Sequence, residues 1–99
     1  MTAQAEVETK VKKTMQVPKK FKVIFLNDDK TPMEWVVTVL TSIFKHSKET
    51  AEQIMLTVHN EGSAVAGVFS YEIAEQKVAE TYSSTRANGF PLRLEVEEE

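Results

Sequence analysis

The stretch FLNDDKTPMEW, Phe25 to Trp35, decides how this chain folds, because an apolar run stops there and a helix start follows directly. One amide and two carboxylates, Asn27, Asp28 and Asp29, separate the two parts. Asn and Asp side chains bond readily to nearby backbone and interrupt strands. The stretch therefore predicts a strand that ends at Leu26 and a polar turn behind it.

The residues TPME, 31–34, predict the start of a helix. They fit a capping box, in which Thr31 accepts a hydrogen bond from the Glu34 amide and the Glu34 side chain reaches back to Thr31. Pro32 suits the first helical position, because its fixed φ is helical and its missing N–H has no partner there anyway. The capping box accounts for these residues but leaves the amide and the two acids unexplained.

The residues before the turn predict a strand and a tail. The run FKVIFL, residues 21–26, has the aromatic and β-branched content of a strand, and we expect it to be buried on both faces. Residues 1–20 contain five Lys and two Glu, show no lasting apolar period and include Pro18. We therefore expect a flexible N-terminal arm over residues 1–20 and a folded core over residues 21–97.

Two amphipathic helices are predicted behind the turn. The first has apolar residues at the spacing of one helix face: Met33, Val36, Val37, Leu40, Ile43 and Phe44. His46 interrupts this pattern, and Ser47 can cap a second helix that ends at Gly62 in a left-handed conformation. The inner face of the second helix carries Ala51, Ile54, Met55, Val58 and His59.

The rest of the chain predicts a strand, a helix and a strand. SAVAGVF, residues 63–69, is short and β-branched, which favours a strand. Ser70 can cap a third helix that has Glu72 in its first turn and ends at Asn88 and Gly89. The inner stripe of this helix is Ile73, Ala74, Val78 and Thr81. Apolar and charged residues then alternate as in a strand with one wet face: Leu92, Arg93, Leu94, Glu95 and Val96.

The element order is thus βααβαβ. Segregated elements of this kind predict an α+β sandwich, in which a three-stranded antiparallel sheet is covered by three helices. The chain has no Cys, which excludes disulfides, thiolate metal sites and a cysteine nucleophile. Lysines without Arg or aromatic neighbours do not predict nucleic-acid binding. No apolar run reaches the roughly 18 residues of a membrane span, so we expect no membrane partner and a cytoplasmic protein, with a plastid not excluded.

The polar turn has four interpretations. Asn27, Asp28 and Asp29 could be turn residues alone. They could hold a metal, although the alternating Asp pattern of a calcium loop is absent. They could form a carboxylate pair for acid-base catalysis, although adjacent residues of an extended chain point to opposite faces. They could also accept hydrogen bonds from an ammonium group, which would then lie beside apolar side chains.

The second helix offers what an ammonium site with an apolar neighbour needs. Met55, Val58 and His59 share one helix face, because residues three and four apart are adjacent. A single His on an apolar face is most often a satisfied core residue, and Met is most often a gap filler. Together with Met33 and Val36, however, these side chains could form an apolar pocket with a polar mouth.

Three blocks of the chain resemble the ClpS family, whose members are adaptors that bring N-degron substrates to a Clp-type AAA+ unfoldase and protease. NDDKTPMEWV is similar to one family block, and MLTVHNEGSAVAGVFSYEIAEQKV resembles two more at the family spacing. The resemblance spans residues 21–94 and implies the same α+β fold. It implies no enzyme activity, no metal and no other cofactor.

Carried over by position, the resemblance implies four sets of site residues. The contacts to the substrate α-amino group fall on Asn27, Asp28 and His59. The wall of the hydrophobic pocket falls on Thr31, Met33, Val36, Met55, Val58 and Leu92. Asp29 supports the loop, and the unfoldase-binding surface falls on Glu72 and Lys77.

The resemblance implies binding of a free α-amino group and a bulky first side chain, Leu, Phe, Tyr or Trp. The implied partner is the N-terminal domain of a ClpA- or ClpC-type unfoldase, to which the N-terminal arm delivers the substrate. One rival is a ribosome-associated or structural module, because the fold resembles that of a ribosomal stalk protein. Another is a metal-dependent hydrolase that uses Asp28, Asp29 and His59.

Overall fold

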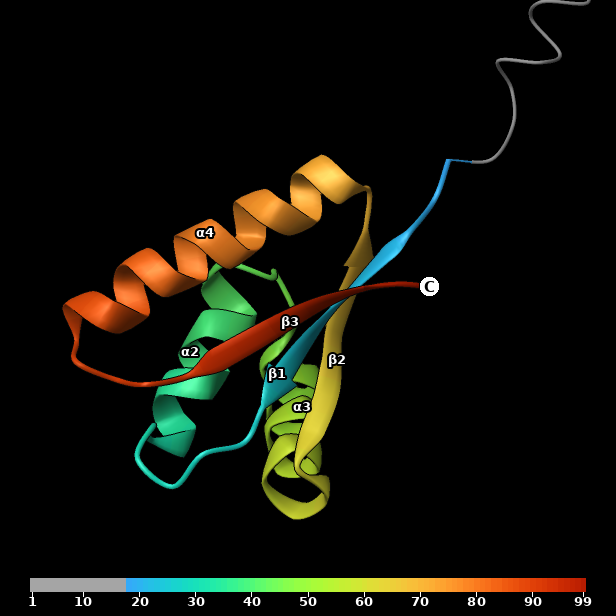
Figure 1. Cartoon of the computed structure of the whole chain (residues 1–99). Coiled ribbons are helices and arrows are strands. Elements are labelled where there is room, and N and C mark those ends of the chain that lie inside the picture. Colours follow the sequence, from blue (N-terminus) through green and yellow to red (C-terminus); the bar gives the residue numbers. More distant parts are fainter. Residues whose placement is uncertain (1–17) are drawn as a thin grey trace, which may run out of the picture.

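Figure 1 shows the computed structural model of the chain, which describes residues 18–99. The elements follow in the order β1 (Phe21–Leu26), α2 (Met33–Ser42), α3 (Lys48–Glu61), β2 (Ser63–Phe69), α4 (Tyr71–Ala87) and β3 (Arg93–Glu98). The predicted βααβαβ order is confirmed. The expected N-terminal arm lies, apart from residues 18–20, outside the described residues.

β1 is the central strand of a sheet ordered β2-β1-β3, and it runs antiparallel to both neighbours (Figure 1). Phe25 of β1 lies opposite Leu94 of β3. On the other side a β-bulge shifts the register after Val23, and Leu26 at the end of β1 pairs with Ser63 at the start of β2. The predicted three-stranded antiparallel sheet of an α+β sandwich is therefore confirmed.

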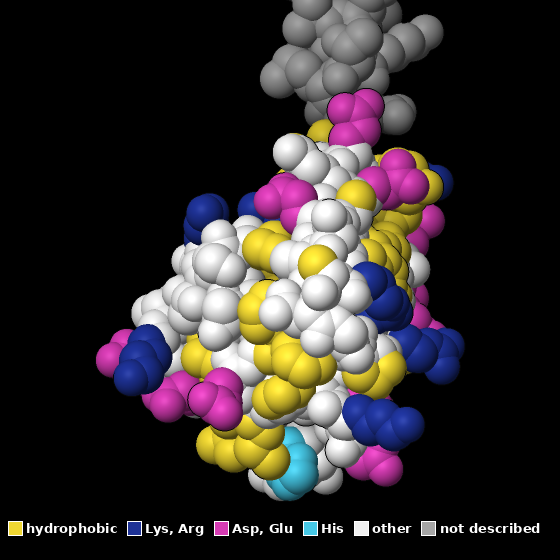
Figure 2. Space-filling model, turned by 90° about the vertical axis from the view of Figure 1, so that its left-hand side faces the viewer, with side chains coloured by type: hydrophobic (Ala, Val, Ile, Leu, Met, Phe, Trp, Pro, Cys, Tyr) yellow, Lys and Arg dark blue, Asp and Glu magenta, His cyan; other side chains and the backbone are white. Residues whose placement is uncertain are grey.

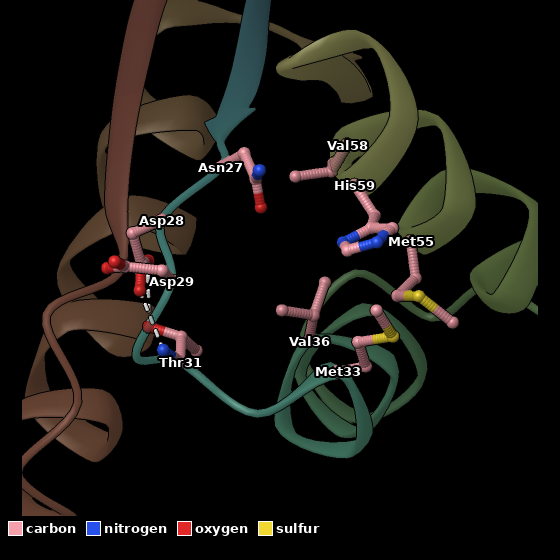
Figure 3. A pocket seen from close by; sticks show the side chains of 9 residues that line it. All are labelled: Asn27, Asp28, Asp29, Thr31, Met33, Val36, Met55, Val58 and His59. Carbon is pink, nitrogen blue, oxygen red and sulfur yellow. Dashed lines mark hydrogen bonds between the residues drawn. The ribbon is translucent and has the colours of Figure 1, made fainter.

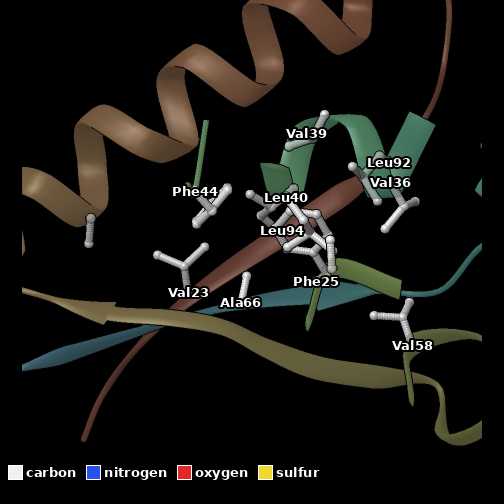
Figure 4. Close-up of a cluster of buried hydrophobic side chains, with 12 residues drawn as sticks. Val23, Phe25, Val36, Val39, Leu40, Phe44, Val58, Ala66, Leu92 and Leu94 are labelled. Atoms are coloured by element: carbon white, nitrogen blue, oxygen red, sulfur yellow. The ribbon is translucent and has the colours of Figure 1, made fainter. Parts of the chain in front are cut away.

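The helices cover one face of this sheet. Val23 and Phe25 have no exposed surface, whereas Lys22, Ile24 and Leu26 on the other face are half-buried. The buried cluster combines residues of all three helices with the inward-facing residues of the strands (Figure 4). The expectation that β1 is buried on both faces is therefore wrong, because all three helices contribute to the core on the same side.

α2 is shorter than its apolar pattern predicted. The pattern continued to Phe44, but the helix ends at Ser42 and Lys45 has a φ of 62°. Few non-glycine residues adopt such a φ, so the chain turns sharply here. Phe44 is still buried, because its ring packs edge-on against Phe25 with 5.3 Å between the ring centroids. The apolar pattern therefore predicted the burial of Phe44 correctly, although the helix ends before this residue.

α3 begins and ends where the sequence predicted. The Ser47 side chain accepts a hydrogen bond from the Thr50 amide at 3.2 Å. Gly62 has a φ of 93°, and its N–H donates to the carbonyl of Val58 at 3.0 Å. A left-handed residue of this kind closes the helix at no steric cost when it is Gly. The end of α3 is therefore fixed, and the chain enters β2 in a defined direction.

α4 also starts and ends as predicted, but two details differ. Ser70 is the N-cap residue, yet its side chain makes no capping hydrogen bond. Ile73, expected on the inner stripe, is 41% exposed, whereas its neighbour Ala74 is fully buried. Successive residues differ by about 100° around a helix, so only one of the two can face the core. The buried stripe ends at Thr85, which has no exposed surface.

Candidate functional site

The polar turn and the end of α3 meet because β2 follows α3 in the chain and pairs with β1. Leu26 and Ser63 are register partners. One residue further on, the N–H of Asn27 donates to the carbonyl of Gly62 at 2.9 Å. His59 lies one helical turn before Gly62. Figure 3 shows that Asn27 and His59 consequently lie on two sides of one cavity.

This cavity has a volume of about 260 Å³ and lies between the turn, α2 and α3. Its lining consists of Asn27, Asp28, Asp29, Thr31, Met33, Val36, Met55, Val58 and His59. The structure thus brings together all but one of the residues that the sequence assigned to the α-amino contacts, the pocket wall and the loop. Their roles in binding remain predictions.

The cavity has an apolar wall and a polar side. Val36 and Val58 are 6% and 3% exposed and join the wall to the hydrophobic core. Met33 is 43% exposed and Met55 is half-buried, so both methionines lie at the rim. Figure 3 shows the two methionines together, across the cavity from the acidic turn. A ligand with one apolar and one polar end matches this division.

Asp28 holds the acidic turn together. Its Oδ1 accepts hydrogen bonds from the amides of Lys30 at 2.8 Å and Thr31 at 2.6 Å, and its Oδ2 accepts one from the Thr31 hydroxyl at 2.8 Å. The predicted capping box is therefore wrong. Pro32 is the N-cap residue of α2 and no side chain caps that end. Thr31 bonds to Asp28 instead, because a charged acceptor forms stronger hydrogen bonds than a neutral one.

Opposing effects act on the pKa of Asp28. Partial burial raises the pKa of this carboxyl group, since burial disfavours the charged form. The amide and hydroxyl hydrogen bonds from Thr31 and Lys30, together with the charge of Arg86, outweigh burial and lower the pKa below its usual value of 3.8. Asp28 is therefore ionised at neutral pH and presents a fixed negative charge at the cavity.

Asp29, predicted to support the loop, lies in the lining of the cavity. The hydrogen bonds that hold the loop come from Asp28. The Asp29 side chain is exposed, lines the cavity and makes no hydrogen bond within residues 18–99. Asp28 lies two residues before Lys30 and three before Thr31, a spacing at which an Asp side chain can accept hydrogen bonds from the backbone amides. Asp29 lies one residue closer to both amides and accepts from neither.

Leu92 does not line the cavity. It is 1% exposed and belongs to the hydrophobic core, where Figure 4 shows it beside Val36. Its role in the pocket wall therefore stays a prediction that the cavity lining does not support. Because Val36 does line the cavity, Leu92 supports the wall from behind. A sequence pattern cannot separate a wall residue from the residue that backs it, since both are apolar and buried.

Glu72 and Lys77, the predicted unfoldase-binding residues, lie on α4 and away from the cavity. Glu72 is exposed in the first turn of the helix. Lys77 is half-buried, and its ammonium group donates to the carbonyl of Ile43 at 2.7 Å and lies 6.0 Å from the ring centroid of Phe69. Lys77 therefore has a structural contact at the end of α2 that the sequence did not indicate.

Arg86 is a contributor to the site that sequence patterns missed. Its Nη1 donates to the carbonyls of Phe90 at 2.8 Å and Leu92 at 2.9 Å, which holds the loop that leads into β3. Its charge also helps to lower the pKa of Asp28. The two residues are far apart in the chain, so no local spacing could have indicated that they are close.

These features define a class of protein before any relative is considered: a small α+β binding module with an apolar cavity rimmed by amide, carboxylate and imidazole groups. The sequence model of the family described as ATP-dependent Clp protease adaptor protein ClpS matches residues 16–95. The chain belongs to the ClpS family and is an adaptor of the Clp protease. The family name describes an adaptor and not a catalytic enzyme.

Individual relatives agree with this assignment. The chain is 42% identical to a ClpS adapter protein of Oleidesulfovibrio alaskensis, over 99% of this chain and 94% of the relative. It is 47% identical to one of Caulobacter sp. strain K31, over 98% and 89%. A solved structure of Agrobacterium tumefaciens ClpS2 bound to L-phenylalaninamide superimposes with a TM-score of 0.80 and 43% identity, covering 84% of this chain and all of that one. The solved structure has the same α+β fold over the part of the chain that it covers.

The family assignment favours an adaptor over the ribosome-associated module and the hydrolase. Residues 18–99 contain no group of three or more His, Cys, Asp or Glu side chains placed to hold a metal ion. The hydrolase hypothesis built on Asp28, Asp29 and His59 therefore gains no support from the described residues. Within the same residues no helix is long and apolar enough to cross a membrane.

Proposed function

We propose that this adaptor binds the free α-amino group and the bulky first side chain of substrate proteins that begin with Leu, Phe, Tyr or Trp. It then delivers them in the cytoplasm to a ClpA- or ClpC-type AAA+ unfoldase. The observation that carries the proposal is the cavity itself, which combines an apolar wall with hydrogen-bond acceptors at its mouth. The L-phenylalaninamide bound to the Agrobacterium relative supports it, because that compound has a free amino group and a benzyl side chain.

The polar side of the cavity suits an ammonium group. A chain N-terminus has a pKa near 8, so at neutral pH it is mostly a cation with three N–H donors. The Asn27 side-chain oxygen, the Asp28 carboxylate and a ring nitrogen of His59 accept them. Two carboxylate oxygens offer about four acceptor sites, of which the turn uses three in Asp28, so one remains. Asp29 adds a second negative charge beside the cation.

The apolar side of the cavity selects the first side chain. Burying a large apolar side chain against Val36, Met55 and Val58 contributes about 2–3 kcal/mol. Two charge-assisted hydrogen bonds contribute roughly 1.5–3 kcal/mol each, so the gross total is about 5–9 kcal/mol, which brackets micromolar affinity. Internal residues of a protein have no ammonium group, so the site reads the chain end. Affinity of this order suits reversible delivery.

Delivery requires a second surface. We place the unfoldase contact on α4, at Glu72 and Lys77, which both lie outside the lining of the cavity. A substrate in the cavity then leaves this surface free, so that one small protein can hold both partners at once. The exposed Tyr71 and Ile73 beside Glu72 are consistent with a contact surface.

Calorimetry with a Phe-initiated peptide and its N-acetylated form tests the proposal. We expect a micromolar dissociation constant for the free peptide and binding at least about 100-fold weaker for the acetylated one, because two charge-assisted hydrogen bonds are lost. His59→Ala should weaken binding of the free peptide about 10-fold. Asn60→Ala, on the same exposed helix turn but outside the cavity lining, is the matched control. Equal affinity of the two peptides would overturn the proposal.

A further inference from the structure

Exposed apolar side chains occur on more than one face of the molecule. Figure 2 views the left-hand side of Figure 1 and shows hydrophobic side chains gathered low on that face, beside a histidine side chain. The cavity accounts for apolar surface on the side of α2 and α3. The sheet carries a second apolar surface, on the face that the helices leave uncovered within residues 18–99. The lining of the cavity contains none of the residues of this second surface.

The strand register fixes which side chains form this second surface, because residues paired across neighbouring strands point to the same side of a sheet. Ile24 is paired with Val65 on β2 and with Glu95 on β3. We call the surface the outer sheet face; its residues are Lys22, Ile24, Leu26, Ser63, Val65, Val68, Arg93, Glu95 and Glu97. Val65 and Val68 are 42% and 41% exposed. β1 and β2 thus supply the aliphatic side chains of the face, and β3 supplies charged ones.

The outer sheet face is too small for a stable contact with a second copy of the chain. Three strands about 4.8 Å apart, each about six residues long at about 3.4 Å per residue, give an area of roughly 300 Å². A stable interface between two proteins buries about 800 Å² on each partner. A segment of the same chain needs less area, because its tether keeps it at a local concentration of the order of millimolar. The size of the face therefore favours a segment of this chain over a separate partner.

Residues 10–17, KVKKTMQV, precede the part of the chain that the structure describes and have a composition that matches this face. An extended conformation puts alternate side chains on one side, which here are Val11, Met15 and Val17. The segment carries three Lys and no acidic residue, whereas residues 93–99 carry one Arg and four Glu. Its charge of +3 therefore complements the charge of −3 on β3 and the residue that follows it. The segment matches both the aliphatic part of the face and the acidic strand beside it.

The described residues place the start of this segment's connection at the end of the sheet. The carbonyl of Lys20 accepts a hydrogen bond from the amide of Glu99 at 2.9 Å, so the chain continues the line of β1 up to Lys20. One residue earlier, the ammonium group of Lys19 lies 3.9 Å from a carboxylate oxygen of Glu98. A basic residue that precedes β1 thus already forms an ion pair with an acidic residue of β3.

We propose that residues 10–17 turn back at Pro18 and dock along the outer sheet face. Eight extended residues reach about 26 Å, and the sheet is about 20 Å long, so the segment spans the full length of the face. Its aliphatic side chains pack on those of β1 and β2, while its lysines face Glu95 and Glu97 of β3. Docking withholds the segment from other partners until it is released. Because the face and the cavity share no residue, the inference does not depend on the proposed function.

Limited trypsin digestion of the full chain, followed by mass spectrometry, tests the proposal. Trypsin cuts after Lys, and cleavage of a segment that opens and closes rapidly follows the population of its open form. The reference is a free peptide of residues 5–20, digested under the same conditions. We expect cleavage after Lys12 to be about 5- to 20-fold slower in the protein than in the peptide. Higher salt should reduce this ratio, since exposed charges are screened.

Val65→Thr and Val96→Thr are the matched variants, because both keep a β-branched residue in a strand. Val65 is 42% exposed on the outer sheet face. Val96 is 37% exposed but is paired with the fully buried Val23, so it points to the side that the helices cover. Val65→Thr removes apolar contact from the face and should speed cleavage after Lys12 by about 2- to 5-fold. Val96→Thr should leave the rate unchanged.

A second pair of variants tests the charges. Glu97→Gln on the outer sheet face should speed cleavage by about 2-fold, whereas Glu80→Gln on α4 should not, although both glutamates are exposed. Equal cleavage rates in the protein and the free peptide, or equal effects of Val65→Thr and Val96→Thr, would overturn the proposal. Protection that rises with protein concentration would also overturn it and would assign the face to a second copy of the chain.

Discussion

Asp28 shows how one side chain sets the local shape of the site. Its two oxygens accept hydrogen bonds from the amides of Lys30 and Thr31 and from the Thr31 hydroxyl. The local sequence predicted that Thr31 caps α2. Instead, the amide and the hydroxyl of Thr31 both donate to the Asp28 carboxylate. The turn is therefore held from within, and Asn27 and Asp29 are left free to face a ligand.

Replacing Asp28 with Asn should loosen this turn. The variant keeps one acceptor oxygen and replaces the other with an amide that cannot accept from Thr31. We expect the free energy of unfolding at pH 7 to fall by about 1–2 kcal/mol. This is the contribution of hydrogen bonds to a charged group, reduced because solvent screens a partly exposed carboxylate. Urea unfolding measures this through the fluorescence of Trp35, the single Trp of the chain.

The same pair of proteins should differ less in acid. A carboxyl group whose pKa is lowered by folding stabilises the protein above its unfolded pKa, and this contribution disappears as the pH falls through the folded pKa. The lowered pKa of Asp28 thus predicts that the gap between wild type and Asp28→Asn closes below about pH 3.8. Asp29→Asn, without a hydrogen bond to lose, should change stability by less than about 0.5 kcal/mol. A gap that stayed constant down to pH 3 would contradict the assignment.

Met33 is the residue at which selectivity for the first side chain is expected. It is 43% exposed at the rim of the cavity, so its truncation leaves the core intact. Met33→Ala should admit peptides that begin with Ile or Val, because the branched Cβ no longer meets the methionine. Calorimetry with Ile- and Val-initiated peptides measures the gain. Unchanged rejection of both peptides would place the filter at another residue.

At the scale of elements, α4 and α2 are joined through Lys77. The ammonium group of Lys77 donates to the carbonyl of Ile43, which follows the end of α2. Cations are favoured at helix C-termini, where carbonyl groups lack partners. The proposed unfoldase contact and this structural contact therefore use the same side chain, and any effect of replacing Lys77 combines the two.

The stability of Lys77→Met, measured without the unfoldase, isolates the structural contact. We expect the substitution to lower the free energy of unfolding by about 1–2 kcal/mol, because a half-buried carbonyl loses a charged donor while the apolar stem is kept. For a domain of this size that corresponds to a fall in Tm of several degrees. Gln76→Met, at the exposed neighbouring position, is the control and should leave Tm nearly unchanged. Equal Tm values for the two variants would show that the Ile43 contact contributes nothing.

At the scale of the whole molecule, Trp35 links the start of α2 to the end of α4. Its indole N–H donates to the hydroxyl of the fully buried Thr85 at 2.9 Å. Its ring also packs near Phe90, with 5.7 Å between ring centroids. Because Trp35 lies between the cavity residues Met33 and Val36 in the sequence, this contact positions one wall of the cavity against the far helix.

Thr85→Val should weaken both stability and ligand binding. The variant keeps the shape of the side chain but leaves the indole N–H without its acceptor, which costs about 1 kcal/mol. We also expect weaker binding of a Phe-initiated peptide, by about 2- to 5-fold, because the start of α2 is less firmly held. Thr81→Val is the matched control, since Thr81 is equally buried but bonds only to Lys77 within its own helix. Similar peptide affinities for both variants would contradict a link between Trp35 and the cavity.

Most of the fold followed from local patterns. Apolar periods, the caps at Ser47 and Gly62 and the stop at Asn88 depend on residues a few positions apart, so the order and the approximate bounds of the elements were predictable. The errors arose where distant groups intervene. Ile73 and Ala74 both fit an inner stripe, and only packing of α4 on the sheet decided that Ala74 is buried and Ile73 is 41% exposed.

The sequence by itself determined the βααβαβ order, the polar turn and the residue types of the site, because these depend on short-range hydrogen bonding and on the period of apolar residues. The tertiary structure alone decided that Asn27 and His59 face one cavity, since this requires β1 to pair with β2 and Asn27 to bond to Gly62. It also decided that Leu92 backs the wall and that Lys77 holds the end of α2. Contacts between residues distant in the chain depend on how the elements pack, and a local pattern contains no information about that.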